Sequence, residues 1–227
     1  MADALLSEQR RITRVALQAL GQDGFALAGS GAIREHGLID RPTQDIDLFT
    51  VASARERFSP ALDSVVEALE EHGYVVDVLR RSAGFAQLEV TGSSGLTIEM
   101  DLGVDWRAHA PVRLEVGPVL SIDDAVGNKI AALYSRGEVR DYLDADAIRQ
   151  AERYSDGQLI ELARTSDTGF DLAYFIHRLD GARQLDVDQV ADYGLGAADL
   201  ARIKTRMAMW ASTLRKQLAN NEDEQRS

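Results

Sequence analysis

The hydrophobic periodicity of the chain changes along its length, and this change restricts the fold more than any other feature of the sequence. Residues 4–20 and 55–73 place apolar side chains at helical spacing. Between residues 74 and 104, apolar and polar residues alternate with the period of a half-buried strand, whereas from Ser121 onward the pattern is helical almost throughout. The chain therefore combines a sheet-forming N-terminal half with a helical C-terminal half.

Short strands complete the predicted N-terminal half. They are expected at residues 25–29, 45–51, 74–80, 85–92 and 95–104, with one further candidate within 113–120. The order helix, strand, short helix, strand, helix, strands predicts an α+β fold, a small mixed sheet with helices on one face, followed by a helical lobe. The predicted organisation is an α/β lobe over 1–120, a helical lobe over 121–219 and a flexible tail over 220–227.

The composition excludes several classes of protein. The 227 residues contain no cysteine, which excludes disulfides, thiolate metal sites and a cysteine nucleophile. No apolar run reaches the length of a membrane span and the N-terminus lacks a signal-peptide pattern, so we expect a cytoplasmic protein with no membrane partner. The net charge of −12 argues against non-specific wrapping of nucleic acid, although it leaves room for a local basic patch.

Two aspartates lie two positions apart in the expected strand 45–51. Asp45 and Asp47 therefore project to the same side of the strand, whereas Ile46 and Leu48 project to the core. Two carboxylates on one face repel each other, and either water or a cation must offset that repulsion. Mg²⁺ takes oxygen ligands and few protein carboxylates, so a metal site is one interpretation, and two solvated acids at a strand end is the other.

A glycine–serine pair precedes these acids along the chain. Gly29 and Ser30 lie directly after a buried strand and before a helix start. Glycine permits close backbone approach, and N–H groups at a helix start bind phosphate, so the pair is a candidate phosphate loop. An ordinary turn with Ser30 as the helix N-cap is the alternative.

A third acid comes from the expected strand 95–104. Glu99 and Asp101 share the face opposite its apolar residues. If this strand lies beside 45–51, three carboxylates meet, and three acids with a phosphate loop are typical of two-metal phosphoryl transfer. We favour Asp101 as the third acid because it lies nearer the end of the strand, and Glu99 is the alternative.

A lysine marks the first helix of the C-terminal half. Lys129 lies on the flank of the buried stripe, with Arg136 further along the same side. A lysine near a buried face needs an anionic partner, unless its head group reaches water. Asp144, in the next helix, can pair with Lys129 or Arg136, or it can position a substrate group; a salt-bridged helix pair is its simplest interpretation.

Together these residues resemble the DNA polymerase β-type nucleotidyltransferase superfamily. The features that carry the resemblance are Gly29-Ser30, Asp45-Ile46-Asp47 and Asp101. The sequence is more closely similar to the AbiEii/MenT group of toxin nucleotidyltransferases, through Arg41 and Thr43 before the aspartates and through a helix-pair pattern formed by Lys129, Ala132, Arg136, Arg140, Asp141 and Asp144. The resemblance covers roughly residues 25–150, and the last third of the chain carries no matching motif.

The resemblance implies a function. A member of this group transfers a nucleoside monophosphate from an NTP to an acceptor hydroxyl, here the tRNA 3′ end, releasing pyrophosphate, and a cognate antitoxin protein restrains it. It implies nucleotide binding by Gly29, Ser30, Arg41, Thr43, Lys129 and Arg136. It implies Mg²⁺ or Mn²⁺ binding by Asp45, Asp47 and Asp101, with these three, Lys129 and Asp144 as the catalytic set.

Three alternatives remain open. A small-molecule nucleotidyltransferase of the aminoglycoside type suits the acidic charge, and a non-catalytic module of the same fold is the second. A dinucleotide-binding enzyme is disfavoured, because Arg34 replaces the third glycine of that motif and hairpin-like strands follow residue 74. Basic clusters on the first and last helices form either an RNA-binding patch or solvated helix faces.

Overall fold

The computed structural model describes residues 2–21, 23–41, 43 and 45–225. It divides into two compact units, Met1–Ala125 and Val126–Ser227. The division follows Ala125, whereas the sequence analysis places the lobe boundary after residue 120. Within the described ranges, no helix combines the length and the apolar character needed to cross a membrane.

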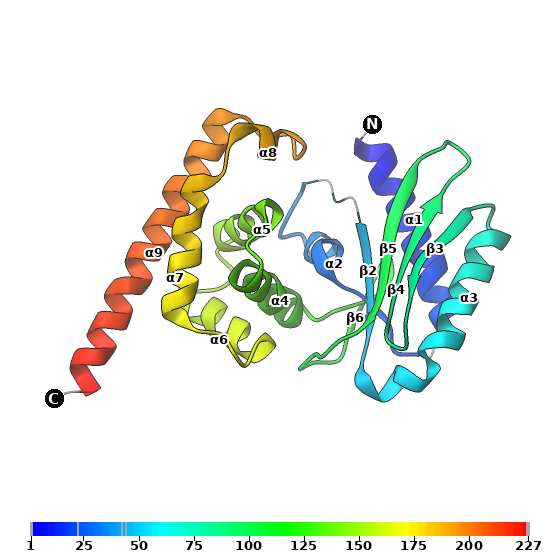
Figure 1. Ribbon diagram of the computed structural model, residues 1–227, viewed down its shortest axis with the longest axis horizontal. Coiled ribbons are helices and arrows are strands. Elements are labelled where there is room, and N and C mark those ends of the chain that lie inside the picture. The colour runs from blue at the N-terminus through cyan, green and yellow to red at the C-terminus, as the bar shows by residue number, and fades with distance from the viewer. Residues whose placement is uncertain (1, 22, 42, 44, 226–227) are drawn as a thin grey trace. The chain divides into compact units, whose positions relative to one another are not determined.

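A mixed sheet organises the N-terminal unit (Figure 1). Its strand order is β3-β4-β5-β2-β1-β7-β6 over the described residues. The strands are β1 (Ala26–Leu27), β2 (Asp45–Thr50), β3 (Val75–Arg81), β4 (Phe85–Thr91), β5 (Thr97–Val104), β6 (Val112–Leu114) and β7 (Gly117–Val119). β2 pairs in parallel with β5, and β1 with β7, whereas the other neighbours are antiparallel. The predicted class, a small mixed sheet with helices, is confirmed.

Helices pack against this sheet. α1 (Ala2–Leu20) and α3 (Phe58–Glu71) pack together, α2 (Gly29–Glu35) contacts β2, and the 3₁₀ helix η1 (Ala52–Arg57) follows β2 along the chain (Figure 1). Leu48, Leu88 and Met100 are fully buried on the apolar face. Because strand side chains alternate, the opposite face, which we call the polar face, carries Asp45 and Asp47.

The segment 113–120 differs from the expected single strand. It contributes to two short strands, β6 and β7, which pair as an antiparallel hairpin. Gly117 has φ +126°, and a Cβ at this position would lie 3.0 Å from Cδ1 of Leu17 in α1. This backbone conformation, which only glycine adopts readily, interrupts the expected strand. The absence of a side chain also lets α1 approach closely.

Helices alone form the C-terminal unit among the described residues. α4 (Ile122–Ser135) begins just before the division, and α5 (Val139–Gln150), α6 (Asp156–Ser166), α7 (Leu172–Asp180), η2 (Gly181–Gln184), α8 (Val187–Ala191) and α9 (Ala197–Gln225) follow. Trp210 is fully buried at its core, with its ring edge-on to Phe175 at 5.3 Å. α9 continues into the segment predicted as a flexible tail, of which Arg226 and Ser227 lie outside the described residues.

Candidate active site

The pairing of β2 with β5 brings the candidate carboxylates to one face. Asp47 lies opposite Asp101 in the parallel register, and Asp45 lies opposite Glu99. All four share the polar face, and side chains opposite each other on neighbouring strands start about 4.8 Å apart. The condition on which the third acid depended, that strand 95–104 lie beside 45–51, is therefore met.

The register also distinguishes the two candidates for the third acid. Asp101 is half-buried and faces Asp47, whereas Glu99 is exposed and lies one row further along the sheet. Gln87 of β4 completes the row of Asp101 on its other side. We call Asp47, Asp101 and Gln87 the carboxylate row.

A glycine backbone forms the support for Asp47. Gly29 has φ +55°, and a Cβ built there would lie 1.7 Å from Oδ2 of Asp47. The N–H of Ala28 also donates to the backbone oxygen of Asp47 at 2.8 Å. No side chain fits at position 29 while Asp47 keeps its place, so glycine is required here by conformation and by space.

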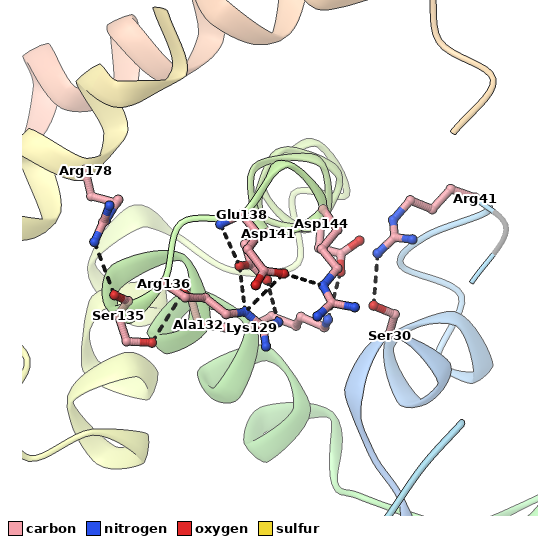
Figure 2. Close-up of polar contacts among 11 residues, drawn as sticks. Ser30, Arg41, Lys129, Ala132, Ser135, Arg136, Glu138, Asp141, Asp144 and Arg178 are labelled. Atoms are coloured by element: carbon pink, nitrogen blue, oxygen red, sulfur yellow. Dashed lines mark hydrogen bonds and ion pairs between the residues drawn. The ribbon is translucent and has the colours of Figure 1, made fainter. Parts of the chain in front are cut away.

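Ser30 and Arg41 form a second contact at this loop. Nη2 of Arg41 donates to Oγ of Ser30 at 2.9 Å (Figure 2). The N-cap of α2 is Ala28, so the alternative that Ser30 caps the helix is wrong. The hydroxyl and the guanidinium predicted to bind phosphate thus lie together, where the first turn of α2 meets the segment between α2 and β2.

Thr43 lies in a different network. Its hydroxyl accepts from Nη1 of Arg34 at 2.7 Å and donates to Oε1 of Gln9 at 3.2 Å, and its carbonyl accepts from Nε2 of Gln9 at 2.6 Å. Burial lowers the pKa of the Arg34 guanidinium. The network fixes the segment ahead of β2, and sequence reasoning missed it, although a glutamine one turn before Ile12 on the buried stripe of α1 was a signal.

Lys129 and Asp144 form a buried ion pair in the C-terminal unit. Nζ of Lys129 lies 2.9 Å from Oδ2 of Asp144, with side chains 7% and 0% exposed (Figure 2). The alternative that the lysine head reaches water is therefore wrong. Arg136 instead forms two parallel bonds with Asp141, of 2.9 and 2.8 Å. Lys129 of α4 and Arg136, which follows the end of α4, thus use different aspartates of α5.

The donor set fits a divalent cation only when a nucleotide completes the shell. Across the described part of the chain, no group of three or more acidic or histidine side chains is arranged so that it could hold a metal ion. Mg²⁺ in nucleotide sites uses one or two carboxylates together with substrate phosphates and water. Asp47 and Asp101, facing each other beside the Gly29 loop, suit that division of ligands.

A second row of acids crosses the polar face beside the carboxylate row. The register aligns Asp77 with Glu89, Glu89 with Glu99, and Glu99 with Asp45. We call these four residues the acid row. Like charges directly opposite each other on neighbouring strands destabilise a sheet, so the acid row lowers the stability of the N-terminal unit.

Replacing Glu89 should therefore stabilise the protein. Glu89→Gln removes one charge that faces two like charges, those of Asp77 and Glu99. Each such repulsive pair costs roughly 0.2–1 kcal/mol. We expect the free energy of unfolding to rise by about 0.5–1 kcal/mol in urea titrations at low salt. The gain should shrink in 1 M salt, where the Debye length is about 3 Å. A variant less stable than the wild type at low salt would contradict this.

The basic clusters are largely engaged in ion pairs. On α9, Arg206 pairs with Asp146, Arg215 with Asp180 and Arg202 with Asp199, while Lys204 donates to the carbonyl of Arg183. On α1, Arg10 pairs with Glu35 and Glu115. Of the two interpretations, the structure favours charged helix faces over an open RNA-binding patch.

Comparison with solved structures identifies the fold. MenT4, the nucleotidyltransferase toxin Rv2826c from Mycobacterium tuberculosis H37Rv, is similar with a TM-score of 0.58 and 17% identity, over 94% of this chain and 90% of that one. JHP933 from Helicobacter pylori gives 0.59 and 16%, over 96% and 95%. The fold is that of a nucleotidyltransferase.

The family model "Nucleotidyl transferase AbiEii toxin, Type IV TA system" matches residues 12–225. The chain therefore belongs to the AbiEii family of nucleotidyltransferase toxins, and it is an enzyme of that class. The resemblance found in residues 25–150 is confirmed, and it extends over the C-terminal helices in which no motif was found. No curated protein sequence matches the chain.

Proposed function

We propose that this enzyme transfers a nucleoside monophosphate from an NTP to the 3′-terminal hydroxyl of tRNA, using Mg²⁺ or Mn²⁺, as the toxin of a toxin–antitoxin pair. The observation that carries the proposal is the position of Asp47, which faces Asp101 and rests on the backbone of Gly29. Phosphoryl transfer depends on positioning and on neutralising charge, and this arrangement supplies both next to a candidate phosphate loop.

The candidate site residues of the N-terminal unit are each assigned a role. Ser30 and Arg41 bind the triphosphate through hydroxyl and guanidinium hydrogen bonds. Asp47 and Asp101, with Asp45 on the same face of β2, would hold the divalent cation once substrate phosphates complete its shell, and the cation would neutralise charge on those phosphates. The acceptor oxygen bonds to the α-phosphorus while the bond from that phosphorus to the bridging oxygen breaks. Pyrophosphate leaves, and Asp101 receives the acceptor proton.

In the C-terminal unit, we assign Lys129 and Arg136 to nucleotide binding. Thr43, in the N-terminal unit, contributes to nucleotide binding indirectly, through its hydrogen bonds with Gln9 and Arg34. Asp144 positions Lys129, because its carboxylate fixes the ammonium group at 2.9 Å. A charged group held in advance loses little freedom when phosphate binds, which is how such a pair favours the reaction.

The decisive experiment compares two acids of β5. Purified protein is incubated with Mg²⁺, each α-labelled NTP in turn, and tRNA. We expect label in tRNA with the wild type, and a loss of about 10²–10³-fold in Asp101→Asn, because a metal ligand is worth several kcal/mol. Glu99→Gln is the matched control: it removes the same charge from the same face of the same strand, and it should retain transfer.

The other outcomes each contradict part of the proposal. Activity in Asp101→Asn together with its loss in Glu99→Gln would make Glu99 the third acid. Folded wild type that labels no acceptor with any NTP would favour a non-catalytic module. Growth arrest on expression, relieved by a neighbouring gene product, would support the toxin role.

One observation favours a second acceptor. The acid row and the net charge of −12 suit a cationic small molecule better than RNA. An aminoglycoside should therefore be tested as acceptor in the same assay. Label on the drug with none on tRNA would support a small-molecule nucleotidyltransferase.

A further inference from the structure

A third row crosses the polar face on the other side of the carboxylate row. Phe49 of β2 and Phe85 of β4 both lie opposite Gly103 of β5. Each of the three is two positions along its strand from a member of the carboxylate row, so it shares that face at a distance of about 7 Å along the strand. We call Phe49, Gly103 and Phe85 the aromatic row.

Gly103 provides space between the two rings. A Cβ at this position would lie 3.0 Å from Cδ1 of Phe49, so the Phe49 ring leans over the glycine. Gly103 is not among the glycines with positive φ, and its lack of a side chain therefore serves close packing rather than backbone conformation. Phe85 is 36% exposed, and the row presents an aromatic surface to solvent next to the carboxylates.

The charge around the carboxylate row is unequal on its two sides. The acid row lies on one side, and the uncharged aromatic row lies on the other. An anionic polymer that reaches Asp101 is therefore repelled from one side and accepted on the other.

We infer that the aromatic row binds the terminal nucleotide of a single-stranded RNA 3′ end, with its base stacked on Phe85. This inference rests on the proposed function and names the subsite for its acceptor. Unpaired bases stack on aromatic side chains with little dependence on sequence, and each stack contributes roughly 1–3 kcal/mol.

The strand order supports this placement. The Gly29 loop follows β1 and contacts Asp47 of β2, whereas Phe85 belongs to β4, beyond Asp101 of β5. The proposed triphosphate site and Phe85 therefore lie toward opposite sides of the Asp47–Asp101 pair. Attacking and leaving oxygens must be roughly in line in phosphoryl transfer, and reactants that approach from opposite sides meet that requirement.

The test measures RNA binding and transfer separately. An RNA hairpin with a single-stranded 3′ end is titrated against wild type, Phe85→Ala, Phe85→Leu and Phe85→Trp without NTP. The same variants are then assayed for transfer. We expect the Kd and the KM for RNA to rise about 10-fold in the alanine and leucine variants, and the tryptophan variant to bind as the wild type does. The KM for NTP should stay within about twofold.

A matched control refines the test. Leu79→Ala removes a side chain that is 52% exposed on β3, outside the aromatic row, and it should change neither constant.

Failure of the inference and failure of the proposed function give different results. Wild type that binds no RNA hairpin, or a Phe85→Ala variant that binds it normally, overturns the inference. So does a Phe85→Leu variant equal to Phe85→Trp, because general apolar docking, as in a protein interface, needs no π-face. Wild type that binds the hairpin through Phe85 but transfers no nucleotide overturns the proposed function and leaves the binding site intact.

Discussion

Gly29→Ala is expected to reduce nucleotidyl transfer by about 10²-fold or more while the protein remains folded. The added Cβ would lie 1.7 Å from Oδ2 of Asp47, so the carboxylate must move by more than 1 Å, and a displacement of this size costs about 10²-fold in rate. The backbone strain of an alanine at φ +55° adds about 1–2 kcal/mol of destabilisation. Urea unfolding and the transfer assay measure the two effects separately.

A glycine just beyond the other end of α2 provides the matched control. Gly37 has φ +74°, and a Cβ there would meet nothing within 4 Å. Gly37→Ala should therefore lose about the same stability through strain, yet retain activity. Equal loss of activity in the two variants would show that backbone strain, and not the contact with Asp47, explains the effect.

The buried ion pair of the C-terminal unit gives the second large effect. Asp144→Asn leaves the Lys129 ammonium buried without its counter-charge, and breaking such a pair costs about 3–5 kcal/mol. That is a large part of the total stability of a domain, typically about 5–15 kcal/mol. Unfolding can be followed through Trp210, which is fully buried in this unit, in a Trp106→Phe background that removes the other tryptophan.

An exposed pair and a double variant complete this comparison. Asp63→Asn breaks the exposed pair of Asp63 with Arg81 and should leave the free energy of unfolding nearly unchanged, because exposed ion pairs contribute little to stability. Lys129→Met combined with Asp144→Leu should recover most of the stability but not the activity, because the ammonium group is absent. A loss below 1 kcal/mol in Asp144→Asn would mean that the pair contributes little to the fold.

Local patterns predicted the faces of the strands correctly. The alternation in 95–104 placed Asp101 opposite the buried side chains, and the same rule placed Asp47, so both acids are on the polar face. The pairing of β2 with β5 was not predictable in this way, because these strands are distant in sequence and a pattern within one strand carries no information on its neighbour. For the same reason the acid row and the aromatic row became visible only with the register.

The sequence also did not determine which of two cations pairs with Asp144. Helical phase placed Lys129 and Arg136 on one side of their helix and left Asp144 available to either. Packing decides, because Asp144 is fully buried with Lys129, whereas Arg136 pairs with Asp141, the residue that completes the capping box of α5. Thr43 was assigned to the nucleotide by resemblance, and its hydroxyl contacts Gln9 and Arg34, a network that depends on how α1 packs.

The contact between Gly29 and Asp47 makes two distant positions a single unit of selection. As long as an aspartate at 47 is needed, every mutation that gives position 29 a side chain is disadvantageous, because it displaces that carboxylate. Once a lineage no longer uses the aspartate, purifying selection on the glycine weakens, because only its positive φ still disfavours other residues. A relative with a bulky residue at the position of Gly29 should therefore be a degenerate copy without catalytic activity, a diagnosis that can be made from its sequence before any assay.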